Sequence, residues 1–180
     1  MKILKYLLFG VLGFIGLALV AALFVKKEYA VVREVTISKP VTQVFPYLKL
    51  LKNQDNFSVW NQKDPNMKKE YKGTDGMVGF VSAWESDNKE VGKGEQEIAK
   101  ITENERVDIK LRFKIPFEAE DNAYFVTEMI DSNTTKVKWG FDGAFPYPMN
   151  LMSLFIDMDK EVGKDLEDGL TSLKALMEKP

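Results

Sequence analysis

Apolar residues recur in steps of three and four along the last part of the chain, from Asn150 to Met177. The recurring positions are Leu151, Phe155, Met158, Val162, Leu166, Leu170, Leu173 and Met177. This spacing predicts one helix with a single apolar face. At about 1.5 Å of rise per residue the helix is roughly 40 Å long, and it needs an apolar partner surface to be stable.

The middle of the chain has the shorter period that is typical of strands separated by turns. The expected strands are Met67–Tyr71, Val78–Glu85, Gly94–Ile101, Val107–Lys114, Phe117–Met129 and Thr135–Phe141. The fourth is the clearest, because apolar residues at every second position from Val107 to Phe113 alternate with charged ones. Such a strand has one buried face and one face in water.

The segment before these strands supplies one more strand and two short helical pieces. Ala30 to Ile37 reads as a strand, Val41 to Leu48 has helical spacing, and a second helical piece or loop leads through Trp60 to a turn at Asp64. The order of elements therefore predicts an α+β fold, in which a curved antiparallel sheet wraps around the long C-terminal helix.

The N-terminal segment from Tyr6 to Val25 is twenty residues long and carries no charge. A helix of this length crosses the hydrocarbon core of a bilayer, so we interpret it as a transmembrane anchor. The alternative is a cleaved signal peptide, with Lys2 and Lys5 as its basic region and Ala22 near the cleavage site. The apolar run exceeds the ~7–15 residues of most signal peptides, which favours the anchor. The expected organisation is an anchor at 1–28 and one domain at 29–180.

Composition excludes several kinds of chemistry. The chain has a formal net charge of −2 with scattered basic residues, which gives no reason to expect a nucleic-acid partner. It contains neither His nor Cys, so a Ser-His-Asp or Cys-His couple, thiol redox chemistry and an ordinary zinc site are all excluded. We expect no cofactor and no metal, and an acid or base would have to be Asp, Glu, Lys or Tyr.

The inward face of the sheet and the helix provide candidate ligand-binding residues. Aromatic, aliphatic and Met side chains of this kind make an adaptable apolar lining for a lipid-like molecule. The alternative is that they fill one another and leave no cavity. The candidates are Phe80, Trp84, Val107, Ile109, Leu111, Phe113, Phe125, Val137, Trp139 and Phe141 from the strands, and Met152, Phe155, Met158 and Val162 from the helix.

Asp121 is the best polar candidate, because alternation places it on the same strand face as Ala123 and Phe125. A carboxylate inside an apolar cavity has a raised pKa and can bind a polar head or act as an acid or base. The alternative is a strand-end position in water. Glu95 and Glu97 also share a strand face, which we interpret as the solvated outer face.

The chain also resembles a known superfamily. The residues that carry the resemblance are Val41 to Phe45, Trp60, Asp64 to Met67, Gly73, Gly76 and Gly79 before Trp84, Val91 to Gly94, Phe155 to Asp165, and Gly169 to Lys174. They resemble the helix-grip START and Bet v 1 superfamily, and more closely its bacterial polyketide cyclase/dehydrase-like (SRPBCC) branch, over residues 30–178. The resemblance implies a deep cavity for a hydrophobic or amphipathic molecule, and it carries no shared catalytic motif.

The leading hypothesis is a membrane-anchored domain that binds a hydrophobic small molecule or lipid without catalysis. One alternative is a cyclase- or dehydratase-type enzyme that uses Asp121, Tyr71, Tyr124 or a strand Glu, and another is an envelope protein-interaction module with an exposed apolar patch. The expected partners are the small molecule and a membrane through residues 6–25. The short basic head predicts a single-pass protein of the bacterial cytoplasmic membrane with its domain on the extracytoplasmic side, although Lys26 and Lys27 nearly balance that head.

Overall fold

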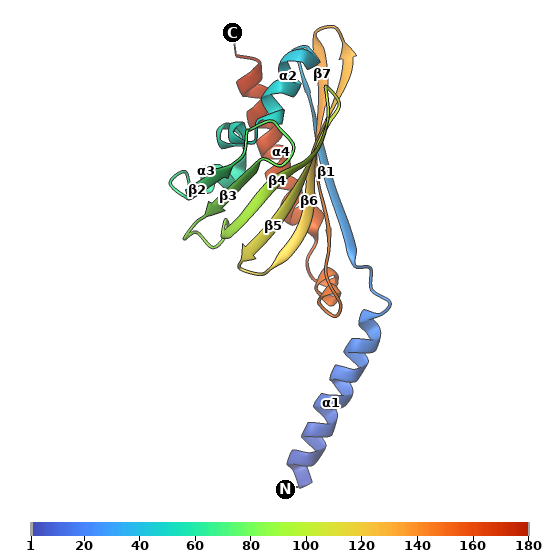
Figure 1. Ribbon diagram of the computed structural model, residues 1–180. Helices are drawn as coiled ribbons and strands as arrows, with labels where there is room; N and C mark the ends of the chain where they lie inside the picture. The colour runs from blue at the N-terminus through green and yellow to red at the C-terminus, as the bar shows by residue number, and fades with distance from the viewer. Residues whose placement is uncertain (1, 180) are drawn as a thin grey trace.

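The computed structural model describes residues 2–179, which form a sheet-and-helix domain with one helix projecting from its end. The projecting helix is α1 (Lys2–Ala22). Figure 1 shows it extending away from the domain as a separate rod. Its apolar stretch Ile3–Ala22 is long enough to cross a membrane, and none of its most apolar part is buried against the domain.

Seven strands form one antiparallel sheet with the order β1-β7-β6-β5-β4-β3-β2. Strands β2 to β7 are each paired with the next along the chain, and β7 then pairs with β1. A register shift between Ile98 and Lys100 marks a bulge in β4, a feature that bends and twists a sheet. The bounds are β1 Glu28–Ile37, β2 Lys68–Lys72, β3 Val81–Glu85, β4 Lys93–Thr102, β5 Arg106–Ile115, β6 Ala119–Asp131 and β7 Thr134–Ala144.

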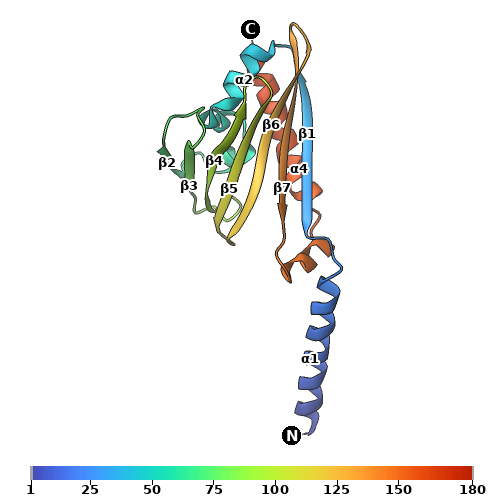
Figure 2. The ribbon, with the colours of Figure 1, turned by 45° about the vertical axis from the view of Figure 1, so that its right-hand side comes forward.

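Helices α2, α3 and α4 lie on one side of this sheet, whereas α1 projects from the end of the domain, as Figures 1 and 2 show. Between β1 and β2 come α2 (Val41–Lys49), the 3-10 helix η1 (Leu51–Asn56) and α3 (Val59–Lys63). After β7 come the 3-10 helix η2 (Met149–Leu154) and α4 (Met158–Met177). The predicted fold class is confirmed: a curved antiparallel sheet holds a C-terminal helix against its inner face.

The core lies between α4 and the sheet. Leu166, Leu170 and Leu173 of α4 are fully buried, and they belong to one cluster with Phe125 and Val137 of the sheet. Full burial of a leucine side chain contributes about 1.5–3 kcal/mol relative to exposure. These three leucines alone therefore stabilise the packing of α4 on the sheet. The predicted apolar face of the helix is therefore correct from Met158 onward.

The prediction of one helix from Asn150 is wrong. Residues 149–154 form η2, the chain bends at Phe155, and α4 begins only at Met158. The side chain of Asp157 caps α4 by accepting a hydrogen bond from the backbone N–H of Asp159 at 3.2 Å. The apolar spacing continues across both helical segments, although the helical backbone is interrupted between them. Phe155 consequently lies on the surface with 87% of its area exposed.

Candidate ligand-binding cavity

A cavity of about 210 Å³ lies between the inner face of the sheet and α4. Strands β3 to β7 form its floor and one wall, while α3, α4, η1 and the loop between β3 and β4 form the rest. Apolar side chains dominate the lining, which favours an apolar ligand or part of one. The lining residues are Gln54, Ser58, Trp60, Asn61, Met67, Trp84, Glu90, Val91, Gln96, Ile109, Leu111, Phe113, Ala123, Trp139, Phe141, Val162 and Leu166.

All three tryptophans of the chain line this cavity. Trp139 of β7 lies at its inner side, with its ring 5.0 Å from that of Phe125 and 6.0 Å from that of Trp60, centre to centre. Trp84 of β3 packs edge-on against Phe113 of β5 at 6.0 Å. These separations fall within the range of favourable aromatic pairs, so the rings support one another around the empty space.

Two glycines make room for these tryptophans. A Cβ at Gly169 of α4 would lie 2.7 Å from Cζ3 of Trp139, and a Cβ at Gly94 of β4 would lie 2.6 Å from Cζ2 of Trp84. Both distances are shorter than any ordinary contact between carbon atoms. Each glycine therefore allows a close approach that fixes where a tryptophan sits in the cavity wall.

Polar groups in the lining come mainly from the segment around η1 and from β4. Gln54 and Ser58 are buried, and Gln96 reaches the cavity from the floor. Among the described lining residues the only carboxylate is that of Glu90, which lies exposed in the β3–β4 loop and pairs with Lys63 of α3 at 3.4 Å. The cavity thus offers neutral hydrogen-bonding groups inside and charge only at its rim.

Six of the sheet residues that the sequence nominated meet in this lining: Trp84, Ile109, Leu111, Phe113, Trp139 and Phe141. The four others do not line the space. Phe80, Val107, Phe125 and Val137 are buried and fill the core beside it. Alternation along a strand identifies the inward face, but which inward side chains border a void depends on packing across the sheet.

The helix residues nominated for the cavity are mostly placed elsewhere. Phe155 is exposed, Met152 lies in η2, and Met158 packs against the edge of the core and borders a separate open groove. Their placement follows from the late start of α4, and only Val162 of the nominated helix positions lines the cavity. Gln54, Ser58 and Met67 also line the cavity, and the sequence did not nominate them. Gln54 and Ser58 come from short segments without a periodic pattern, and Met67 lies just before β2.

Asp121 is buried, with 6% of its area exposed, on the strand face that alternation predicted. It does not border the cavity. The hydroxyl of Tyr29 on β1 donates a hydrogen bond to Oδ1 of Asp121 at 2.8 Å. Gly143 of β7 lies between the two strands at this point, and a Cβ there would overlap the carboxylate. The pair therefore forms a small polar site of its own at the side of the sheet.

Burial dominates the ionisation of this pair. Desolvation raises the pKa of Asp121, the nearby Asp142 raises it further, and the hydrogen bond from Tyr29 offsets part of the rise. Desolvation and the hydrogen bond to Asp121 also raise the pKa of the Tyr29 hydroxyl. No cation is paired with Asp121 within the described chain, which is why burial sets the direction.

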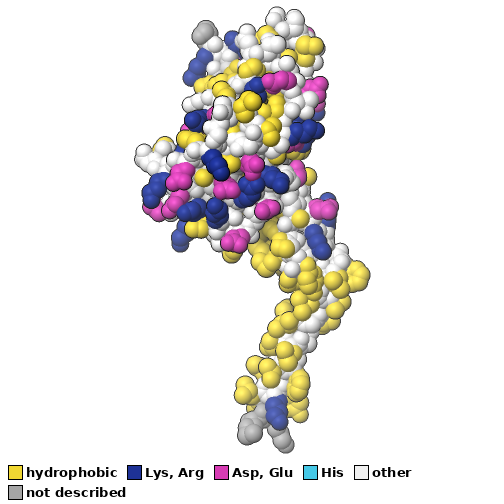
Figure 3. Space-filling model, in the orientation of Figure 1, with side chains coloured by type: hydrophobic (Ala, Val, Ile, Leu, Met, Phe, Trp, Pro, Cys, Tyr) yellow, Lys and Arg dark blue, Asp and Glu magenta, His cyan; other side chains and the backbone are white. Residues whose placement is uncertain are grey.

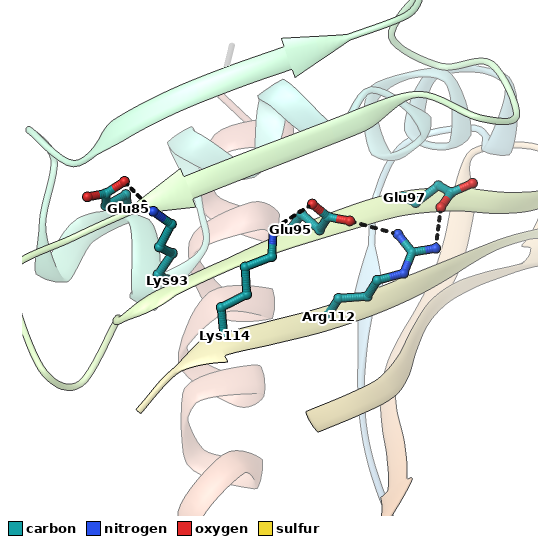
Figure 4. Close-up of polar contacts among 6 residues, drawn as sticks. All are labelled: Glu85, Lys93, Glu95, Glu97, Arg112 and Lys114. Carbon is teal, nitrogen blue, oxygen red and sulfur yellow. Dashed lines mark hydrogen bonds and ion pairs between the residues drawn. The ribbon is translucent and has the colours of Figure 1, made fainter. Parts of the chain in front are cut away.

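Glu95 and Glu97 point away from the cavity, on the outer face of the sheet. Figure 4 shows them beside Arg112 and Lys114 of β5, with α4 behind the sheet. Arg112 bridges both carboxylates, at 3.0 Å to Glu95 and 2.5 Å to Glu97, and Lys114 reaches Glu95 at 3.2 Å. Burial tends to raise the pKa of Glu95, but the hydrogen bonds from Lys114 and Arg112 outweigh it and hold the pKa below its ordinary value.

Comparisons with known proteins identify the fold. No protein-family model matches the chain. No curated protein sequence matches it either. Solved structures do match. The Mll3558 protein from Rhizobium loti shares 15% identity with a TM-score of 0.60, over 82% of this chain and 96% of that one.

Norcoclaurine synthase from Thalictrum flavum matches with a TM-score of 0.61 at 9% identity, over 87% of this chain and 98% of that one. Its structure in complex with dopamine and hydroxybenzaldehyde matches with a TM-score of 0.58 at 10% identity, over 86% and 91% of the two chains. Similarity at this level of identity establishes a shared helix-grip fold of the Bet v 1 type. Function has to be argued from the site itself.

Proposed function

We propose that this chain is a membrane-tethered domain that binds a small hydrophobic or amphipathic molecule in the cavity beneath α4, without catalysing a reaction on it. The observation that carries the proposal is a mostly apolar cavity bordered by all three tryptophans and by the neutral polar groups of Gln54, Ser58 and Gln96. Apolar walls with a few polar groups are what a site for an amphipathic molecule requires.

The size of the cavity limits the ligand. A dry apolar cavity of about 150 Å³ is known to accept benzene, and the cavity here is about 210 Å³. The ligand class we propose is therefore a single-ring aromatic compound or an acyl segment of similar volume. Dopamine and hydroxybenzaldehyde, present in the matching norcoclaurine synthase structure, are each single-ring aromatic molecules, which supports this class by analogy.

The chemistry of the lining supports binding over catalysis. A general acid or base must come within hydrogen-bond reach of the reacting atoms. Glu90 is exposed at the rim and paired with Lys63, and Asp121 lies outside the lining, bonded to Tyr29. The described lining thus presents hydrogen-bonding and apolar groups to a ligand, with no titratable group deep inside.

We propose that α1 is the membrane tether. The stretch Ile3–Ala22 is long and apolar enough to cross a membrane, and its most apolar part does not pack into the domain, which argues against a core helix of a soluble protein. A signal sequence has the same composition, and the length of the run favours an anchor. We propose the topology of a basic cytoplasmic head with the domain on the extracytoplasmic side.

Tryptophan fluorescence tests the binding proposal, because every tryptophan of the chain borders the cavity. The full-length protein in detergent is titrated with benzyl alcohol and, separately, with hexanol. We expect saturable quenching or a spectral shift. The variant Ala123→Leu adds bulk directly into the cavity and should abolish the saturable change.

The matched control is Ala99→Leu, the same substitution at an exposed position of β4. It should respond as the unmodified chain does, since effects of the alcohols on the micelle are common to all three proteins. Urea unfolding verifies that both variants are folded. A saturable response that persists unchanged in Ala123→Leu would show that the probes bind elsewhere, and no saturable response in the unmodified chain would contradict the proposed ligand class.

A further inference from the structure

The end of α1 is joined to the domain by specific hydrogen bonds. The side-chain amide of Asn150, in η2, donates to the carbonyl of Ala22 at 2.7 Å and to that of Val25 at 2.9 Å. Asn150 and Ala22 are both completely buried. Tyr147 adds a hydrogen bond from its hydroxyl to the carbonyl of Leu19 at 3.2 Å.

The bonds to Leu19 and Ala22 satisfy carbonyls that the end of a helix leaves without partners, and the bond to Val25 fixes the chain just after it. On the domain side, the backbone N–H of Phe145 donates to the carbonyl of Lys27 at 2.9 Å, which extends the pairing of β1 with β7. Residues 23–27 are thus held at both ends. The segment 145–155 therefore fixes the direction of α1 relative to the sheet. The connection between α1 and the domain is not a flexible linker.

The same segment carries exposed apolar side chains next to α1. We define the foot surface as Leu23, Phe24, Tyr147, Met149, Leu154 and Phe155, which are all exposed. Phe24 and Phe155 are the most exposed, at 85% and 87%. Figure 3 shows hydrophobic side chains along α1 and on the end of the domain beside it, whereas charged side chains cover much of the visible face above.

An open groove adjoins the foot surface. It runs between the start of β1 and residues 153–159, and it combines Lys26 and Lys27 with the apolar side chains of Phe145, Leu154 and Ile156. The lining also contains the carboxylates of Glu28, Asp157 and Asp159, of which Asp157 pairs with Lys160 and Asp159 with Arg33. Lysines beside aromatic and aliphatic side chains are the composition of a membrane–water interface, where the ammonium group reaches lipid headgroups and the apolar part lies deeper.

We propose that the foot surface is seated in the interfacial layer of a lipid bilayer, with Lys26 and Lys27 at the level of anionic headgroups. The inference rests on the proposed tether. Its occupant is lipid and not a protein, because the foot surface continues the apolar surface of α1 through a joint that Asn150 holds. The turn between β5 and β6, where Phe117 is 72% exposed, points toward the same end of the domain (Figures 1 and 2).

The chain contains no Cys, so single-cysteine variants can be labelled at one chosen place. We would label Phe155→Cys in the foot surface, Phe14→Cys in the middle of α1, and Ser132→Cys in the turn between β6 and β7 at the far end of the domain, each with the environment-sensitive dye NBD. The full-length variants are reconstituted into phosphatidylcholine/phosphatidylglycerol vesicles that contain lipids with a nitroxide quencher near the headgroup or deep in the acyl chain.

We expect the label at 155 to be quenched by the shallow nitroxide, the label at 14 by the deep one, and the label at 132 by neither. Quenching at 14 with a water-exposed, unquenched label at 155 would overturn the seating and leave the tether intact. No quenching at 14 would overturn the tether and the seating with it. A blue-shifted label at 155 that no lipid quencher reaches would indicate a protein partner or a second copy, which also overturns the proposal.

Asn150→Ala, made in the Phe155→Cys background, tests the joint. Without its amide the direction of α1 is no longer fixed, so quenching at 155 by the shallow nitroxide should fall. Asn150→Ala made separately in the Phe14→Cys background should leave quenching at 14 by the deep nitroxide the same. Asn133→Ala, in the exposed turn after β6, is the matched control and should change neither. Unchanged quenching at 155 in the Asn150→Ala variant would show that the foot surface is not positioned by this joint.

Discussion

Two glycines on α4 face different kinds of neighbour, and this difference gives a matched experiment. A Cβ at Gly169 meets the ring of Trp139, which is itself held between Phe57 and Phe125. A Cβ at Gly163 meets the guanidinium end of Arg33, which is partly exposed and pairs with Asp159 at 2.8 Å. Rotation of the neighbouring side chain can make room for a Cβ at Gly163 but not for one at Gly169.

We expect Gly169→Ala to lower the free energy of unfolding by about 1–3 kcal/mol, the range for overpacking a core, and to shift the tryptophan emission. Gly163→Ala should be near neutral or stabilising by up to about 1 kcal/mol, because alanine is the better helix former. Urea unfolding of both variants measures the difference. Equal effects of the two substitutions would contradict the close packing of Trp139 on α4.

Asp121 gives the domain a pH dependence whose sign follows from burial. Its pKa is raised above the ordinary 3.8 in the folded chain, mainly by desolvation. Above pH 3.8 the folded state therefore binds more protons than the unfolded state, until the raised pKa is passed. The contribution of this group to stability is fully present below pH 3.8 and is lost as the pH rises through the raised pKa.

Asp121→Asn keeps an oxygen that accepts the Tyr29 hydrogen bond and removes the charge. We expect the variant to be more stable than the unmodified chain at neutral pH and to lose this part of the acid-side slope. Urea unfolding from pH 3.5 to 7.5 measures it, with the exposed Asp87→Asn as control. An unchanged slope in Asp121→Asn would mean that the carboxylate is well solvated.

Local sequence patterns predicted on which face of the sheet a side chain lies, but not which other side chains it contacts. Alternation placed Asp121 on the inward face because strand geometry is local, and its side chain is buried there. It could not separate Trp84, which borders the cavity, from Phe125, which fills the core, because that depends on contacts between strands distant in sequence.

At η2 and α4 the periodicity of apolar residues gave a wrong prediction of the helix boundaries. The apolar spacing continues from η2 into α4, so a sequence pattern alone reads one helix where the backbone makes two. The break coincides with a contact that no local pattern contains, since Asn150 in η2 bonds to carbonyls 125 and 128 residues away. Order and type of the strands were predictable, whereas the pairing of β1 with β7 required the whole chain.

The cap at the start of α4 can be tested by substitution. Asp157→Ala removes the acceptor for the backbone N–H of Asp159, and we expect a loss of about 1 kcal/mol of stability, the usual value of a helix N-cap. Asp157→Asn keeps an acceptor oxygen and should recover most of it. Thermal and urea unfolding measure both variants, and an Asp157→Ala chain as stable as the unmodified one would rule out a stabilising cap.

Hydrogen bonds join α1 to the cavity domain, and the membrane topology that we propose for the two can be tested. Ser132→Cys places a thiol at the end of the domain farthest from α1 (Figure 1). In intact bacterial cells that express this variant, a membrane-impermeant maleimide should label the chain without lysis. Labelling only after lysis would place the domain in the cytoplasm and reverse the proposed topology.

Native mass spectrometry of the full-length protein, released from mild detergent soon after extraction, addresses the cavity itself. We expect the unmodified chain and Ala99→Leu to retain an added mass that corresponds to a small apolar molecule. Ala123→Leu should be detected at the mass of the protein alone. Bare protein in all three preparations, even after incubation with benzyl alcohol or hexanol, would contradict a ligand-binding role for the space beneath α4.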